Sequence, residues 1–321
     1  RARSAPEPYL AEAQRRLTLL RIRFDRAQPG EEDKGWALEA VRLARLVDPE
    51  GWQAYEIASG IHRQWALHLL AKGKPAFEDL DAAVDEANAG LKRSPMKVGL
   101  LINLASALRT RAYEEHDQGL DPRRTLQAAE EALRQALTQP RFREFLLDGL
   151  GNCLALQARF AADHGMDPKA HVEASSIALE ESNSLHPWVG HLASLGEVLA
   201  TLAQYQRWQG ADPTPTLRRA EAAFQQALAL NRNSFQARLA LAEAKAQEVL
   251  WLTEQSLDAN QALLTLRSEA EGAVTLNPAP TRGTNPAPSA VTGFTEATRP
   301  AHQRWAAFLP VPMYESVEKA V

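Results

Sequence analysis

Apolar residues recur at helical spacing through most of the chain. Ala220, Phe224 and Ala227 follow an i, i+4, i+7 pattern, which places them on one face of a helix. In this face, small residues flank one bulky apolar side chain. The same pattern occurs at Ala37, Val41 and Ala44, at Ala129, Leu133 and Ala136, and at Leu266, Ala270 and Ala273. Because small side chains let a neighbouring helix approach closely, these segments are predicted to be helices that stack on one another.

The dipeptides that close successive apolar patterns recur at an almost constant interval of 45 to 47 residues. They are Asp48-Pro49, Ser94-Pro95, Gln139-Pro140, His186-Pro187, Asn231-Arg232 and Asn277-Pro278. Such a fixed period is the signature of a repeat protein. The sequence therefore predicts six tandem units.

A second landmark divides each unit into two helices. The tetrapeptides Gly119-Leu120-Asp121-Pro122, Gly165-Met166-Asp167-Pro168 and Gly210-Ala211-Asp212-Pro213 lie 46 and 45 residues apart. Glycine adopts the left-handed conformation that ends a helix, aspartate caps the next helix, and proline is tolerated in its first turn. Leu257-Asp258-Ala259-Asn260 occupies the equivalent place without proline. Each unit is predicted to be a helical hairpin, with a first helix of roughly 20 residues and a second of roughly 15.

These features resemble the tetratricopeptide repeat family. The resemblance rests on Leu195-Gly196 in a first helix, on Ala220, Phe224 and Ala227 in a second helix, and on the terminal Asn277-Pro278. It implies an all-α solenoid of about six antiparallel helical hairpins, wound as a right-handed superhelix over residues 9–278. The family's usual period is 34 residues, so both helices of each unit are lengthened here.

The lengthened unit and its Gly-x-Asp-Pro turn resemble the arrays that follow the catalytic domain of bacterial multidomain serine/threonine protein kinases. The chain itself contains no glycine-rich phosphate loop, no His-Arg-Asp and no Asp-Phe-Gly. The resemblance implies a non-catalytic, cytoplasmic recruitment or regulatory region, with any kinase domain lying before Arg1.

Composition supports the helical prediction and excludes several other classes. Alanine and leucine supply 101 of the 321 residues, whereas valine and isoleucine supply 18. Helix formers therefore dominate, and a β-sandwich, a barrel or a parallel-sheet enzyme is disfavoured. A formal net charge of −4 disfavours nucleic acid as the main partner. The sequence also lacks an uncharged apolar run long enough to span a membrane.

No catalytic, cofactor-binding or metal-binding residues are predicted. Cys153 is the single cysteine and is expected to be a small buried apolar residue. The histidine pairs lack the spacing of a zinc-binding helix. The seven tryptophans could form an aromatic binding box, but at least the first six are expected to fill the core between lengthened helices.

A stack of hairpins presents a concave face lined by first helices, where a protein or an extended peptide can bind. The resemblance places candidate groove residues on first-helix positions opposite the second helix. Asn103 and Asn152 are similar to the asparagines with which some family members hold a peptide; a solvated helix face is the alternative for each position. The candidates are Gln53, Glu56, Arg63, Ile102, Asn103, Ser106, Arg109, Asp148, Asn152, Glu197, Glu243 and Gln247.

Residues 279–321 differ in character, because prolines cluster at the start of this segment. It is expected to be a proline-rich linker and tail. Trp305, Phe308 and Leu309 make residues 300–314 a possible capping segment, which would cover the last hairpin or enter the groove.

The preferred function is a protein-interaction scaffold, and the alternative is a scaffold for self-assembly.

Overall fold

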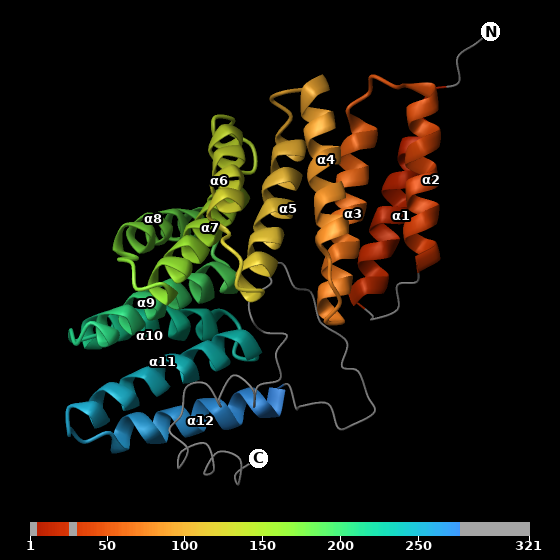
Figure 1. The fold of residues 1–321 in the computed structure, drawn as a ribbon. Coiled ribbons are helices and arrows are strands. Elements are labelled where there is room, and N and C mark those ends of the chain that lie inside the picture. Colours follow the sequence, from red (N-terminus) through yellow and green to blue (C-terminus); the bar gives the residue numbers. More distant parts are fainter. Residues whose placement is uncertain (1–4, 26–30, 277–321) are drawn as a thin grey trace. The chain divides into compact units, whose positions relative to one another are not determined.

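The computed structural model describes residues 5–25 and 31–276, and all regular secondary structure in these ranges is α-helical (Figure 1). The predicted tail, with its possible capping segment 300–314, lies outside the described residues. The helices are α1 (Glu7–Asp25), α2 (Glu31–Val47), α3 (Gln53–Ala71), α4 (Phe77–Arg93), α5 (Val98–Asp117), α6 (Arg123–Leu137), α7 (Arg143–Asp163), α8 (Lys169–Leu185), α9 (Val189–Trp208), α10 (Thr214–Leu230), α11 (Phe235–Glu254) and α12 (Asn260–Leu276).

The helices alternate in length as the repeat predicts. The odd-numbered, first helices have 19 to 21 residues, and the even-numbered, second helices have 15 to 17. Short connections join them into successive hairpins. The predicted all-α fold of stacked helical hairpins is therefore confirmed. None of the helices in the described ranges is both long enough and apolar enough to cross a membrane.

The chain forms two compact units, divided within α7 between Cys153 and Leu154. In the first unit, α1 packs against α2 and α3, and α3 packs against α4 and α5. The first helices α1, α3 and α5 are therefore neighbours in one layer, and the second helices α2, α4 and α6 pack against this layer. In the second unit, α9 packs against α8, α10 and α11, and α11 packs against α12.

Each unit has its own apolar core between these layers. In the first unit, Leu17 and Leu20 of α1, Val41 of α2, and Ile61 and Trp65 of α3 form one buried cluster. In the second unit, the corresponding cluster surrounds Phe224 of α10, whose side chain is fully buried.

The predicted small faces of the second helices are buried. Ala220, Phe224 and Ala227 are each 0% exposed. Glycine at position 196 allows close approach, because a Cβ there would lie 2.4 Å from Phe224 Cε1. The i, i+4, i+7 pattern thus marks the buried face of a second helix, which packs on the first helix of its own hairpin and on that of the next hairpin.

The turns inside the hairpins follow the predicted chemistry. Gly119, Gly165 and Gly210 have positive φ angles of 73°, 69° and 71°. At the first of them, the Leu120 N–H donates to the Glu115 carbonyl at 2.7 Å, which is the closing bond of a Schellman turn. The Asp121 carboxylate then accepts from the Arg123 N–H at 3.0 Å and caps the next helix.

Two details of these turns differ from the prediction. Pro122, Pro168 and Pro213 stand at the N-cap, one position before the first helical turn in which they were expected. In the last hairpin, Ser256 replaces glycine in the left-handed position, with φ of 57°. Asp258 nevertheless caps α12, because its carboxylate accepts from the Asn260 N–H at 2.9 Å.

The prediction that the first six tryptophans fill the core is wrong for three of them. Trp65 and Trp251 are buried, but Trp36, Trp188 and Trp208 are 49%, 36% and 48% exposed. Trp188 directly precedes α9 and Trp208 is its last residue, so both lie at the ends of this helix. Trp36 instead lies under the Arg16 guanidinium, 5.4 Å from its ring centroid.

Candidate functional site

All twelve predicted groove residues lie on first helices and are half-buried. Nine belong to the first unit, on α3, α5 and the part of α7 up to Cys153, and three belong to the second unit, on α9 and α11. Buried atoms without a hydrogen-bond partner among the described residues include Glu56 Oε2, Arg63 Nε and Gln247 Oε1. Because burial of an unsatisfied polar atom costs free energy, such atoms indicate places where a ligand or water can bind.

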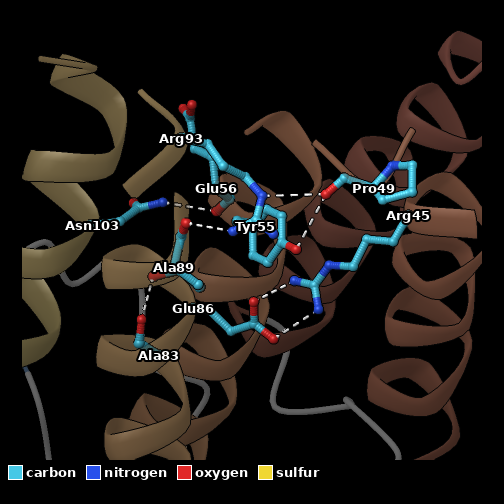
Figure 2. A network of polar contacts seen from close by, with 10 residues as sticks. Arg45, Pro49, Tyr55, Glu56, Ala83, Glu86, Ala89, Arg93 and Asn103 are labelled. Atoms are coloured by element: carbon cyan, nitrogen blue, oxygen red, sulfur yellow. Dashed lines mark hydrogen bonds and ion pairs between the residues drawn. The ribbon is translucent and has the colours of Figure 1, made fainter. Parts of the chain in front are cut away.

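A polar joint fixes the start of α3 against its neighbours (Figure 2). The Tyr55 ring lies between two guanidinium groups, 4.1 Å from Arg45 and 4.2 Å from Arg93. Arg45 of α2 also forms a bidentate ion pair with Glu86 of α4, and Arg93 Nε donates to the Pro49 carbonyl at 3.2 Å. The joint connects the first hairpin to the second and orients the residues that follow Tyr55 on α3.

Two candidates, Glu56 and Asn103, join α3 to α5. Asn103 Nδ2 donates to the Glu56 carbonyl at 2.9 Å (Figure 2). The Glu56 carboxylate lies beside the first turn of α5, since a Cβ on Gly99 would lie 2.2 Å from Glu56 Oε1. Burial raises the pKa of this carboxyl, while the positive charge of Lys97 opposes the rise.

Asn152 forms hydrogen bonds within its own helix. Its Nδ2 donates to the Asp148 carbonyl at 2.9 Å and to Asp148 Oδ1 at 3.0 Å. The Nδ2 groups of Asn103 and Asn152 therefore both make internal hydrogen bonds. The role in holding a peptide that the family resemblance implies for them stays a prediction.

Arg63 on α3 lies near the charges of two other arginines on first helices of the first unit, Arg21 on α1 and Arg109 on α5. Burial, together with the nearby charges of Arg21 and Arg109, lowers the pKa of Arg63 to about 10. Arg21 on α1 was not among the predicted groove residues. The landmarks that set the repeat register begin after α1, at Ala37 and at Asp48-Pro49, so α1 had no register of its own. The one sequence signal for Arg21 is its spacing, because it precedes Arg63 by 42 residues, which is close to the repeat interval of 45 to 47.

Cys153 is fully buried, as predicted, and burial raises the pKa of its thiol to about 12. The neutral thiol is a weak nucleophile at physiological pH. Within the described ranges, no group of three or more histidine, cysteine, aspartate or glutamate side chains is arranged to hold a metal ion.

Asp79 on α4 is a buried carboxylate that links three helices. It accepts from Lys34 Nζ of α2 at 2.5 Å and contacts His62 Nδ1 of α3 at 2.8 Å. Burial raises the pKa of Asp79, but the hydrogen bonds from His62 and Lys34 outweigh this effect and hold the pKa below its usual value. The Asp79 carboxyl therefore loses its proton more readily in the folded protein than in the unfolded chain.

We expect Asp79→Asn to destabilise the protein at neutral pH, with a smaller difference from wild type at low pH. A depressed native pKa contributes stability above the unfolded pKa of about 4, and this contribution is lost as the pH falls through the native pKa. Urea denaturation at pH 7 and pH 3 measures the difference. Asp85→Asn, at an exposed position of the same helix, is the control. A pH-independent difference for Asp79→Asn would contradict the assignment.

Comparisons with known proteins give no family assignment. A scan against protein-family models and a search of curated proteins each found no match. Three solved structures are similar over 69 to 72% of this chain. The first is the MamA protein, with 16% sequence identity, 98% of its chain covered and a TM-score of 0.39. The second is TTC0263, a thermophilic TPR protein of Thermus thermophilus, with 18% identity, 98% of its chain covered and a TM-score of 0.43. The third is PilF of Pseudomonas aeruginosa, with 17% identity, 90% of its chain covered and a TM-score of 0.37.

Proposed function

We propose that the chain is a non-catalytic scaffold that binds a peptide or protein partner on the face of its first helices, which we expect to be concave. The observation that carries this proposal is the set of half-buried polar side chains on α3 and α11 with unsatisfied buried atoms, Glu56 Oε2, Arg63 Nε and Gln247 Oε1. A partner can supply the missing hydrogen bonds there, and within each unit the stacked hairpins hold these side chains in place.

The biological setting follows from the sequence resemblance. The period of about 46 residues and the Gly-x-Asp-Pro turn support a recruitment or regulatory region of a larger cytoplasmic bacterial signalling protein, such as a serine/threonine kinase. In that setting, the array brings a substrate or regulator close to a catalytic domain encoded before Arg1. The reading frame upstream of Arg1 tests this part of the proposal directly.

A display library of random peptides tests the binding face. We expect wild type to enrich peptides whose affinity falls at least tenfold in Ser106→Trp, because the indole would occupy the α5 part of the face. Gln127→Trp is the matched control, since Gln127 is exposed on α6 of the same hairpin. Both variants should retain wild-type helical content. Peptides that lose affinity equally in the two variants, or an absence of enriched peptides, would overturn the proposal.

Self-assembly is the second candidate function. Large apolar side chains on the second helices are exposed, with Leu46 and Ile177 at 66% and Leu264 at 64%. Exposed apolar residues on an outer face can pack against another copy of the chain. Light scattering over a range of protein concentrations separates the two candidates, because only a self-assembling array gains mass with concentration.

A further inference from the structure

Three arginines lie on adjacent first helices of the first unit. Arg21 is on α1, Arg63 on α3 and Arg109 on α5, and these helices pack side by side. Arg21 is exposed, whereas Arg63 and Arg109 are half-buried. The cluster is therefore open to a ligand and also partly shielded from water.

Within residues 5–25 and 31–276, none of the three arginines forms an ion pair or a side-chain hydrogen bond with a carboxylate. Comparably buried arginines elsewhere do form such pairs. Arg45 pairs with Glu86, Arg111 with Asp81 and Glu115, and Arg238 with Glu269. Among the described residues, the lack of an ion pair thus distinguishes Arg63 and Arg109 from these other half-buried arginines.

The uncompensated charge is energetically unfavourable in the free protein. Arg63 Nε is a buried donor without an acceptor in the described structure. Burial and the charges of Arg21 and Arg109 also hold the pKa of Arg63 below its usual value, so Arg63 lies within electrostatic reach of both other guanidinium groups. A bound anion would accept a hydrogen bond from Arg63 Nε and reduce the repulsion between the arginines. Because the anion binds the folded state and not the unfolded chain, it would stabilise the folded protein.

We propose that Arg21, Arg63 and Arg109 bind the carboxylates of an acidic peptide segment of a protein partner. This inference rests on the scaffold function proposed above and names the chemistry of the partner. A guanidinium group presents its N–H donors in a planar fork that matches a carboxylate. The cluster is suited to a short segment, because three helices packed about 8–10 Å apart cover roughly 20 Å, or about six extended residues.

The distribution of charge favours an acidic peptide over nucleic acid. The chain carries 40 acidic and 36 basic residues, and the predicted groove residues of the second unit include Glu197 and Glu243 but no arginine or lysine. Binding to a nucleic acid backbone depends on contacts with many phosphates, and each contact adds to affinity and salt dependence. Three arginines supply few such contacts.

Fluorescence anisotropy with a labelled hexaglutamate peptide tests the inference, and hexaglutamine is the uncharged probe. We expect wild type to bind hexaglutamate and not hexaglutamine. Arg63→Gln and Arg109→Gln should each weaken binding at least tenfold, because each removes a charge-assisted hydrogen-bonding group. Arg42→Gln, at an exposed position on α2, removes the same charge away from the cluster and should change the affinity less than about twofold.

Arg21→Gln and Arg63→Lys keep the test valid if Arg63→Gln loses helical content. Arg21 is exposed, so its substitution leaves the core packing intact, and we expect a several-fold loss of affinity. Lysine retains the charge but lacks the fork, so Arg63→Lys should bind between wild type and Arg63→Gln. Equal losses in Arg42→Gln and the cluster variants would overturn the site.

Two further outcomes separate the inference from the scaffold function. Library peptides that depend on Ser106, but are not acidic and bind Arg63→Gln as tightly as wild type, would overturn the inference and leave the scaffold function intact. A single-stranded oligonucleotide of equal charge that binds more tightly than hexaglutamate, with the same arginine dependence, would show a general polyanion site and overturn the assignment to an acidic peptide.

Discussion

Replacing Phe224 with alanine is expected to lower the free energy of unfolding by about 3–5 kcal/mol. Phe224 is 0% exposed and lies in the core of the second unit with Val198, Leu199 and Leu217. Loss of the ring removes apolar contacts and leaves a cavity that the surrounding helices fill only in part. Urea denaturation followed by circular dichroism measures the change.

Ile177→Ala is the matched control for Phe224→Ala. Ile177 also belongs to the second unit, but its side chain is 66% exposed on α8. Its truncation should change the free energy of unfolding by less than about 0.5 kcal/mol. Similar effects of the two substitutions would show that Phe224 does not occupy the core position described above.

Gly196→Ala is expected to destabilise the protein by about 1–3 kcal/mol, although alanine is the better helix former. The added Cβ would lie 2.4 to 2.7 Å from three atoms of the Phe224 ring. A fully buried ring has little room to move, so α9 and α10 must separate or the ring must leave its preferred rotamer. The shift in the urea midpoint reports this cost.

Gly35→Ala should have the opposite sign. Gly35 lies within α2, is exposed, and has no atom within 4 Å of the position that a Cβ would take. Without a steric cost, alanine should stabilise the helix by about 0.5–1 kcal/mol. If both glycine substitutions stabilise the protein, Gly196 and the Phe224 ring are not as close as described above.

The repeat and its hairpins could be predicted from the sequence because their signals are local. Gly119 and Asp121 act on the backbone within a few residues, so one short stretch contains the whole turn. The small face formed by Ala220, Phe224 and Ala227 is likewise visible as a spacing. Ser256 escaped prediction because serine rarely adopts the left-handed conformation, and here the surrounding turn imposes it.

The candidate site was less predictable, because its properties depend on contacts between separate hairpins. The sequence shows that Arg45 and Arg63 are both arginines, but not that Glu86 of another hairpin pairs with Arg45 while Arg63 has no acidic partner within residues 5–25 and 31–276. The exposure of Trp36 and Trp188 was missed for the same reason. A helical pattern identifies the buried face of a helix and does not indicate how far the neighbouring helix extends along it.

The closure of each turn by neighbouring residues has a consequence for how the protein folds. The bond from the Leu120 N–H to the Glu115 carbonyl and the cap from Asp121 to Arg123 join residues only two to five positions apart. Forming such a turn costs little loop-closure entropy, and contacts of short sequence separation give fast folding. A hairpin can therefore begin to form as soon as it leaves the ribosome, before the next repeat has been synthesised. Early formation shortens the time during which the apolar residues of the hairpin are exposed and can aggregate.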